Sequence, residues 1–91
     1  MTQERKVALV TGASRGIGAA IAQQLIQDGF FVVGTATSES GAEKLSIAFA
    51  EHGAGAVLDV RDGAEIDALV SDIEQKYGSV MVLVNNAGIT K

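Results

Sequence analysis

Four short apolar runs recur along the 91-residue chain and constrain its fold more than any other feature. They cover residues 7–10, 30–33, 56–60 and 80–84. Their hydrophobicity is continuous rather than alternating, which is typical of strands that are buried on both faces of a parallel sheet. The stretches between them carry apolar residues at helical spacing, so the predicted order of elements is β-α-β-α-β-α-β.

Each of the three gaps also carries signals for the ends of a helix. Ser40 with Glu43 predicts a capping box for the second helix, and Asp62 is the expected N-cap of the third. The glycines expected to end the three helices are Gly29, Gly53 and Gly78. The apolar faces are predicted to comprise Ile17, Ile21, Ala22, Leu25 and Ile26 in the first helix, Ala42, Leu45, Ala48 and Phe49 in the second, and Ile66, Leu69, Val70, Ile73 and Tyr77 in the third.

Alternating strands and helices predict an α/β, Rossmann-like fold with a parallel sheet. Right-handed crossovers place the first two helices on one face. If the fourth strand returns to the other side of the first, the strand order is 3-2-1-4 and the third helix covers the opposite face. The carboxyl ends of the first and fourth strands then flank the point where such sheets bind ligands.

Composition excludes several classes of function. The net charge is −4 with no basic cluster, which makes nucleic acid a poor partner. The absence of cysteine excludes disulfides and thiolate metal sites, and no cluster of His and acidic residues suggests a metal. No apolar run approaches the length of a membrane span, and no secretory segment is evident. We therefore expect a soluble, cytoplasmic protein without a membrane partner.

A glycine-rich stretch joins the first run to the first helix. Gly12, Gly16 and Gly18 have the spacing Gly-x-x-x-Gly-x-Gly between a predicted strand and a predicted helix, the context in which glycines bind the pyrophosphate of a dinucleotide. Gly12 lets the chain turn off the strand. Gly16 and Gly18 let the start of the helix, whose N–H groups and dipole attract anions, approach the phosphates. The alternative is a tight turn without a ligand, which the polar residues beside the glycines disfavour.

The end of the second run favours NADP(H) over NAD(H). NAD sites carry Asp or Glu there, but this chain has Thr37, and Glu39 comes later. A carboxylate would repel a 2′-phosphate, whereas the Thr37 hydroxyl can donate to it and Arg15 can add a charge-assisted bond; Arg15 as a solvated turn residue is the alternative. Asp59 either accepts from the adenine amino group, with Val60 on the ring, or caps the following loop.

The fourth run ends in Asn-Asn-Ala-Gly at 85–88. Amides at a strand end can satisfy backbone groups of neighbouring strands and reach a cofactor, and Gly88 allows close approach to the backbone. Alone, an ordinary turn is the simpler interpretation; together with the glycine turn, the motif favours a binding site.

These motifs, Thr-Gly-x-x-x-Gly-x-Gly at 11–18 and Asn-Asn-Ala-Gly at 85–88, resemble the short-chain dehydrogenase/reductase family. The stretch 34–39 resembles its bacterial 3-oxoacyl-[acyl-carrier-protein] reductases, although Met81 stands where members often have Asp. The resemblance implies hydride transfer from NADPH to the 3-keto group of a carrier-bound acyl chain in fatty-acid synthesis. The expected cofactor-binding residues are Gly12, Ser14, Arg15, Gly16, Ile17, Gly18, Thr37, Asp59, Val60, Asn86, Ala87 and Gly88.

The resemblance places the family's catalytic serine, tyrosine and lysine beyond Lys91. We therefore expect residues 1–91 to form one NADP(H)-binding half-domain that is inactive alone. Tyr77 is expected in the core and His52 at a helix end, not in catalysis. Uneven helix cover predicts self-association, as a homo-oligomer or with a complementary fragment. A non-catalytic assembly module and a short-chain reductase of another substrate remain alternatives.

Overall fold

The computed structural model describes residues 6–13, 16–58 and 63–85. The elements follow the predicted order. They are β1 (Val7–Thr11), α1 (Gly16–Gln27), β2 (Phe31–Ala36), α2 (Glu39–Phe49), the 3₁₀ turn η1 (Ala50–His52), β3 (Gly53–Val57), α3 (Gly63–Lys76) and β4 (Val80–Asn85). Within these described ranges, no helix is long and apolar enough to cross a membrane.

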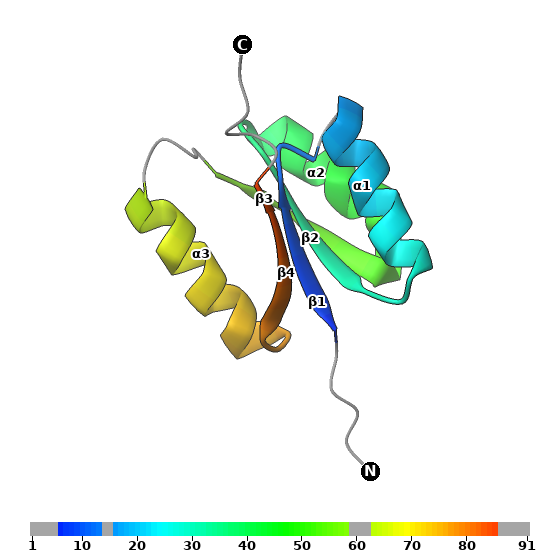
Figure 1. Ribbon diagram of the computed structural model, residues 1–91. Coiled ribbons are helices and arrows are strands. Elements are labelled where there is room, and N and C mark those ends of the chain that lie inside the picture. Colours follow the sequence, from blue (N-terminus) through cyan, green and yellow to red (C-terminus); the bar gives the residue numbers. More distant parts are fainter. Residues whose placement is uncertain (1–5, 14–15, 59–62, 86–91) are drawn as a thin grey trace.

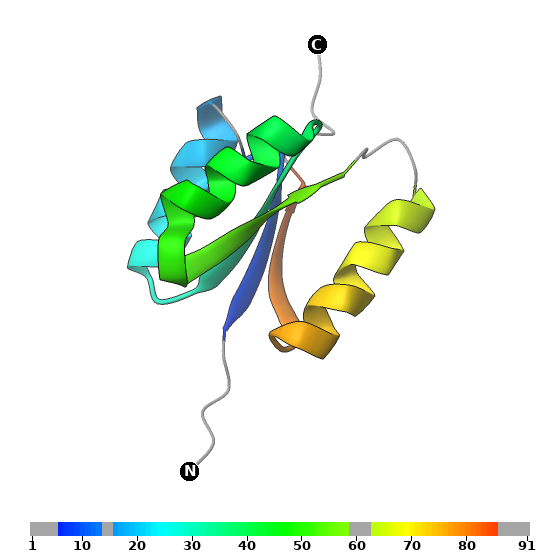
Figure 2. The same ribbon diagram turned by 180° about the vertical axis from the view of Figure 1, so that it is seen from behind.

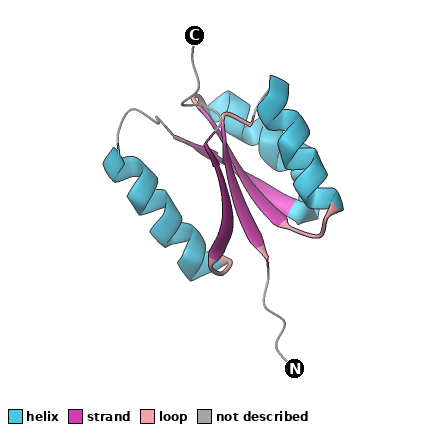
Figure 3. Cartoon of the chain, in the orientation of Figure 1, coloured by secondary structure: helices cyan, strands magenta, loops and turns pink. Residues whose placement is uncertain are grey.

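The four strands form one parallel sheet with the order β3-β2-β1-β4, as predicted. Helices α1 and α2 cover one face and α3 covers the other, so the molecule has three layers (Figures 1, 2 and 3). The central strand β1 is buried along its whole length. Its continuous hydrophobicity is explained by this position, because alternate side chains enter different halves of the core.

The core has two halves, one on each face of the sheet. Strand residues Ala8, Val10 and Val32 pack with Leu45 and Phe49 beneath α1 and α2. On the other face, the buried cluster comprises Val7, Leu9, Val33 and Ile73. Successive residues of β1 therefore serve opposite layers, as the two-residue period of a strand requires.

The end of α1 confirms the predicted role of Gly29. Gly29 has a φ of 97°, in the left-handed region. Its N–H donates to the Ile26 carbonyl at 3.0 Å, and the Phe30 N–H donates to the Leu25 carbonyl at 3.0 Å. These two bonds form a Schellman motif, which turns the chain into β2. Gly78 likewise follows α3 with a φ of 134°.

The third strand differs from its prediction. It begins at Gly53, so Gly53 starts a strand instead of ending a helix, and α2 ends earlier in a 3₁₀ turn. The physical reason is close packing, because a Cβ at Gly53 would overlap the Val32 carbonyl oxygen and one at Gly55 would overlap that of Ala42. The first three residues of the strand, Gly-Ala-Gly, form no apolar run that a sequence pattern can detect, so the prediction of 56–60 overlaps the strand only at Ala56 and Val57.

The predicted cap of α2 and two residues of the predicted apolar faces are also wrong. The N-cap of α2 is Ser38 rather than Ser40, because Ser38 has extended backbone (φ −133°, ψ 159°) and its Oγ accepts from the Gly41 N–H at 3.1 Å. Ile17 was expected on the inner face of α1, but 72% of it is exposed. Ala48 is exposed as well. The expected cap Asp62 lies outside the described residues.

Candidate dinucleotide site

The carboxyl ends of β2, β1 and β4 lie side by side at one edge of the sheet (Figure 1). Thr11, the last residue of β1, is in register with Asn85 at the end of β4. Strand β2 lies beside β1 on one side, and β4 lies beside β1 on the other. The carboxyl ends of β1 and β4 therefore flank the point where the strand order reverses, which is where open α/β sheets bind ligands.

The glycine turn after β1 is fastened to β2. The Gly12 N–H donates to the Thr35 Oγ1 at 3.1 Å, and the Ala13 N–H donates to the Thr35 carbonyl at 2.9 Å. Gly12 and Gly16 have φ values of 64° and 66°, in the left-handed region that favours glycine. The predicted turn is therefore present, with its first two N–H groups directed at the sheet.

The start of α1 has the features of an anion site. Its first turn contains no acidic residue, whereas the first turns of α2 and α3 contain Glu39 and Glu65. The opening N–H groups of a helix have no acceptor within the helix and carry a partial positive charge, which in α1 no carboxylate of the first turn compensates. A Cβ on Gly16 would meet no atom within 4 Å, so there is room in front of the turn. A phosphate group fits this arrangement.

The end of β2 presents a hydroxyl instead of a carboxylate. Thr37 is exposed and lies between the buried Ala36 and the helix cap Ser38. Within the described part of the chain, no hydrogen bond occupies its side chain. The Leu58 N–H donates to the Ala36 carbonyl at 2.9 Å, which brings the end of β3 beside the end of β2.

The structure brings five of the twelve predicted site residues to this edge. They are Gly12, Gly16, Ile17, Gly18 and Thr37. The other seven lie outside the described residues, and their roles stay predictions. They are Ser14, Arg15, Asp59, Val60, Asn86, Ala87 and Gly88.

Two buried threonines support the site through hydrogen bonds that sequence reasoning did not predict, although Thr11 belongs to the recognised glycine motif. Thr35 accepts from the glycine turn through its hydroxyl, and the Thr11 hydroxyl donates to the Val84 carbonyl at 3.4 Å. Together they tie the turn to β2 and the end of β1 to β4. The available signal was one threonine directly after the first apolar run and another shortly after the second.

Tyr77 and His52 lie at the amino ends of the strands, whereas the glycine turn lies at the carboxyl ends. The Tyr77 ring packs on Phe31, the first residue of β2, with 4.5 Å between ring centroids, as expected of a core residue. His52 directly precedes β3, and its Nε2 lies 3.8 Å from the exposed Glu51 carboxylate. Neither side chain faces the site described above.

Comparison with known proteins agrees with this geometry. The short chain dehydrogenase family model matches residues 6–91. The 3-oxoacyl-[acyl-carrier-protein] reductase FabG of Escherichia coli (strain K12) is 52% identical over 91 residues, which are 100% of this chain and 37% of that protein. The protein of the same name from Haemophilus influenzae is 52% identical over 86 residues, 94% of this chain and 36% of its own.

A solved structure shows the same architecture. A short-chain dehydrogenase from Streptomyces avermitilis matches with a TM-score of 0.82 and 42% identity, over 93% of this chain and 31% of that one.

The chain spans somewhat more than a third of the length of the two curated relatives named above. With the family model covering all but the first five residues, the chain belongs to the short chain dehydrogenase family.

Proposed function

We propose that this chain binds NADP(H) as the cofactor-holding part of a reductase that acts on 3-oxoacyl groups carried by acyl carrier protein. The observation that carries the proposal is the glycine turn between β1 and α1, at the point where the strand order reverses. The substrate class is supported by the name of the relatives that are 52% identical to the chain.

The described residues divide the binding of the cofactor between two elements. The N–H groups at the start of α1 hold the pyrophosphate, with Gly16 and Gly18 keeping that approach open. Thr37 donates to the 2′-phosphate at the end of β2. We assign Arg15 to the same phosphate and Asp59 to the adenine. The bound cofactor supplies the hydride.

The remaining predicted residues complete the proposed site. Val60 packs on the adenine ring, Ser14 belongs to the phosphate-binding turn, and Asn86, Ala87 and Gly88 follow β4 beside the cofactor. We infer that residues 1–91 alone hold the cofactor without turnover. The chain has one tyrosine and one histidine, and both Tyr77 and His52 lie at the opposite end of the strands from the glycine turn.

A second candidate function is supported by the exposed surface of β4. Met81 is 63% exposed and Leu83 is 54% exposed on this edge strand. Apolar edge strands pair readily with other chains. We infer that β4 makes the chain associate with a second copy or with a complementary fragment, so an assembly role is the alternative to cofactor binding.

Calorimetric titration of NADPH and NADH tests the cofactor assignment. Because hydrogen bonds to a charged group contribute about 1.5–3 kcal/mol, we expect NADPH to bind at least about tenfold more tightly than NADH. Thr37→Asp places a carboxylate beside the 2′-phosphate and should remove this preference. Ser71→Asp adds the same charge on the exposed surface of α3 and should preserve it. Preference of the wild type for NADH, or binding of neither nucleotide, would refute the proposal.

A further inference from the structure

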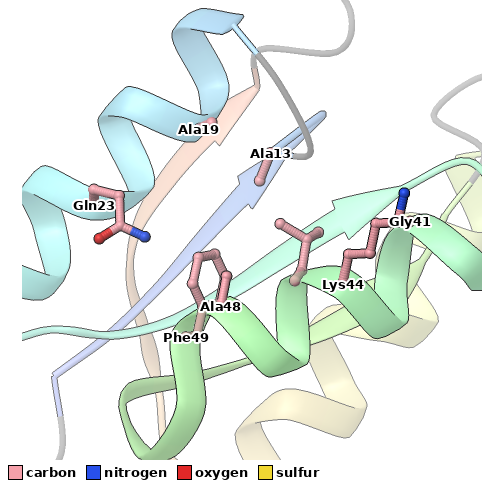
Figure 4. Close-up of a pocket in the computed structure, with 8 residues that line it drawn as sticks. Ala13, Ala19, Gln23, Gly41, Lys44, Ala48 and Phe49 are labelled. Carbon is pink, nitrogen blue, oxygen red and sulfur yellow. The ribbon is translucent and has the colours of Figure 1, made fainter.

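A groove lies between α1 and α2, beside the glycine turn, and its floor faces the sheet (Figure 4). It encloses a volume of about 200 Å³. Both helices pack on the sheet, but the side chains that they direct at each other leave this space unfilled. All the residues that line it belong to the described part of the chain. The proposed dinucleotide site makes no use of it.

The floor of the groove is apolar and rigidly supported. Ala13, Leu45 and Phe49 form it, and all three are buried. Gly34 of β2 lies directly below, since a Cβ there would be 2.8 Å from the Ala13 Cβ and 3.0 Å from the Phe49 ring. The glycine therefore lets Ala13 and Phe49 settle onto the sheet and deepens the groove above them.

The space between the walls is unfilled because the residues that face it there are small. Ala19 of α1 and Ala48 of α2 line the groove from opposite sides (Figure 4). Longer side chains at these positions would fill the space between the helices. Water in such a groove finds few hydrogen-bond partners on the floor, so an apolar group that displaces it gains free energy.

The rim carries a positive charge that no described carboxylate neutralises. Lys44 lines the groove from α2, and within the described ranges its ammonium group forms no ion pair. Figure 4 shows its side chain extending along the helix toward Gly41. Glu43 is adjacent in sequence and so faces a different direction from the helix axis. On the α1 rim, Gln23 offers an amide.

We propose that this groove binds a small carboxylate with an apolar body of up to about eight carbon atoms. An apolar cavity of about 150 Å³ accepts benzene, so the volume here accommodates a slightly larger body. The groove follows α2 from Gly41 to Phe49, about 12 Å at the rise of an α-helix. The body lies on Leu45 and Phe49, and the carboxylate pairs with Lys44. Its floor shares Ala13 with the glycine turn, but it uses none of the residues assigned to the cofactor, so the proposal does not depend on cofactor binding.

The test is a titration of the full chain, followed by amide chemical shifts in NMR. The probes are octanoate, the uncharged 1-octanol with the same body, and acetate, which has the charge alone. We expect saturable binding of octanoate with shifts confined to α1 and α2, weaker binding of octanol, and no saturable response to acetate.

Three variants separate charge from shape. Lys44→Gln keeps the stem but removes the charge, and it should weaken octanoate binding about two- to fivefold, as for an ion pair open to solvent, without changing octanol binding. Ala48→Leu retains a good helix former and fills the groove, so both ligands should lose binding. Lys76→Gln, on the other face of the sheet, should change neither. Absence of octanoate saturation, equal binding of octanoate and octanol, or equal effects of the two lysine variants would overturn the proposal.

Discussion

Gly55 determines how closely α2 approaches the edge strand β3. A Cβ at this position would overlap the Ala42 carbonyl oxygen, which is backbone and cannot rotate away, and would lie 2.9 Å from the Leu45 Cβ. We therefore expect Gly55→Ala to lower the free energy of unfolding by about 2–4 kcal/mol, above the usual cost of overpacking. The measurement is urea denaturation followed by circular dichroism.

Gly63→Ala is the matched control for this prediction. Gly63 begins α3, and a Cβ there would meet nothing within 4 Å. The same substitution should therefore leave stability unchanged or raise it by up to about 1 kcal/mol through the lower entropy of the unfolded chain. Equal effects of the two substitutions would contradict the packing argument.

Single residues also mark where sequence reasoning reached its limit. Glycine spacing identified the turn at Gly12 and Gly16, because positive φ angles are a local property of the chain. The partner of that turn, the Thr35 hydroxyl, is 23 residues away from Gly12 and belongs to another strand. The role of Thr35 depends on how β1 and β2 are placed side by side, and the residues next to Thr35 in the sequence do not reveal this.

At the scale of elements, the start of α2 is held by one hydroxyl. The Ser38 Oγ accepts from the Gly41 N–H, whereas Ser40 lies within the first turn of the helix. Loss of an N-cap serine typically costs about 1 kcal/mol, so Ser38→Ala should lower the free energy of unfolding by that amount. Ser40→Ala should change it by no more than about 0.5 kcal/mol. Thermal or urea unfolding of the two variants decides, and the opposite ranking would restore Ser40 as the cap.

The elements themselves were predictable to different degrees. Strands β1 and β4 are continuous apolar runs, and the four pairs from Val7 to Val10 lie within the predicted limits of both strands. By contrast, β3 consists of glycine, alanine and one valine. It pairs with β2 along its whole length, α2 packs on it, and the Gly55 N–H donates to the Ser46 Oγ at 2.9 Å. Tertiary packing rather than local hydrophobicity selects this strand.

At the scale of the whole molecule, the two edges of the sheet differ. The edge strand β3 is covered by α2, whose Ser46 hydroxyl accepts from its backbone. The edge strand β4 carries the exposed side chains of Met81 and Leu83. Strand β4 also has a register shift against β1 between Val7 and Ala8, so that Val80 and Val82 are paired with consecutive residues. Met81 is the extra residue at this bulge.

The β4 edge leads to a prediction about the oligomeric state. Strand order and right-handed crossovers were enough to expect helices α1 and α2 on one face and α3 on the other, and therefore to expect incompletely covered strand surface. Leu83 is paired with Leu9, which belongs to the core beneath α3, yet Leu83 remains 54% exposed. Exposed apolar surface on an edge strand favours pairing with another chain, so we expect self-association that increases with protein concentration.

Leu83→Lys should shift this equilibrium toward the monomer, because pairing would bury an ammonium group without a partner. Analytical ultracentrifugation over a wide range of concentration measures the shift. Ile47→Lys is the control, since Ile47 is 71% exposed but lies on α2, away from β4. If the wild type sediments as a monomer at every concentration, or if both substitutions dissociate the oligomer equally, β4 is not the interface. If only Leu83→Lys acts, the association runs through the sheet edge and leaves the glycine turn at the carboxyl ends of the strands accessible to cofactor.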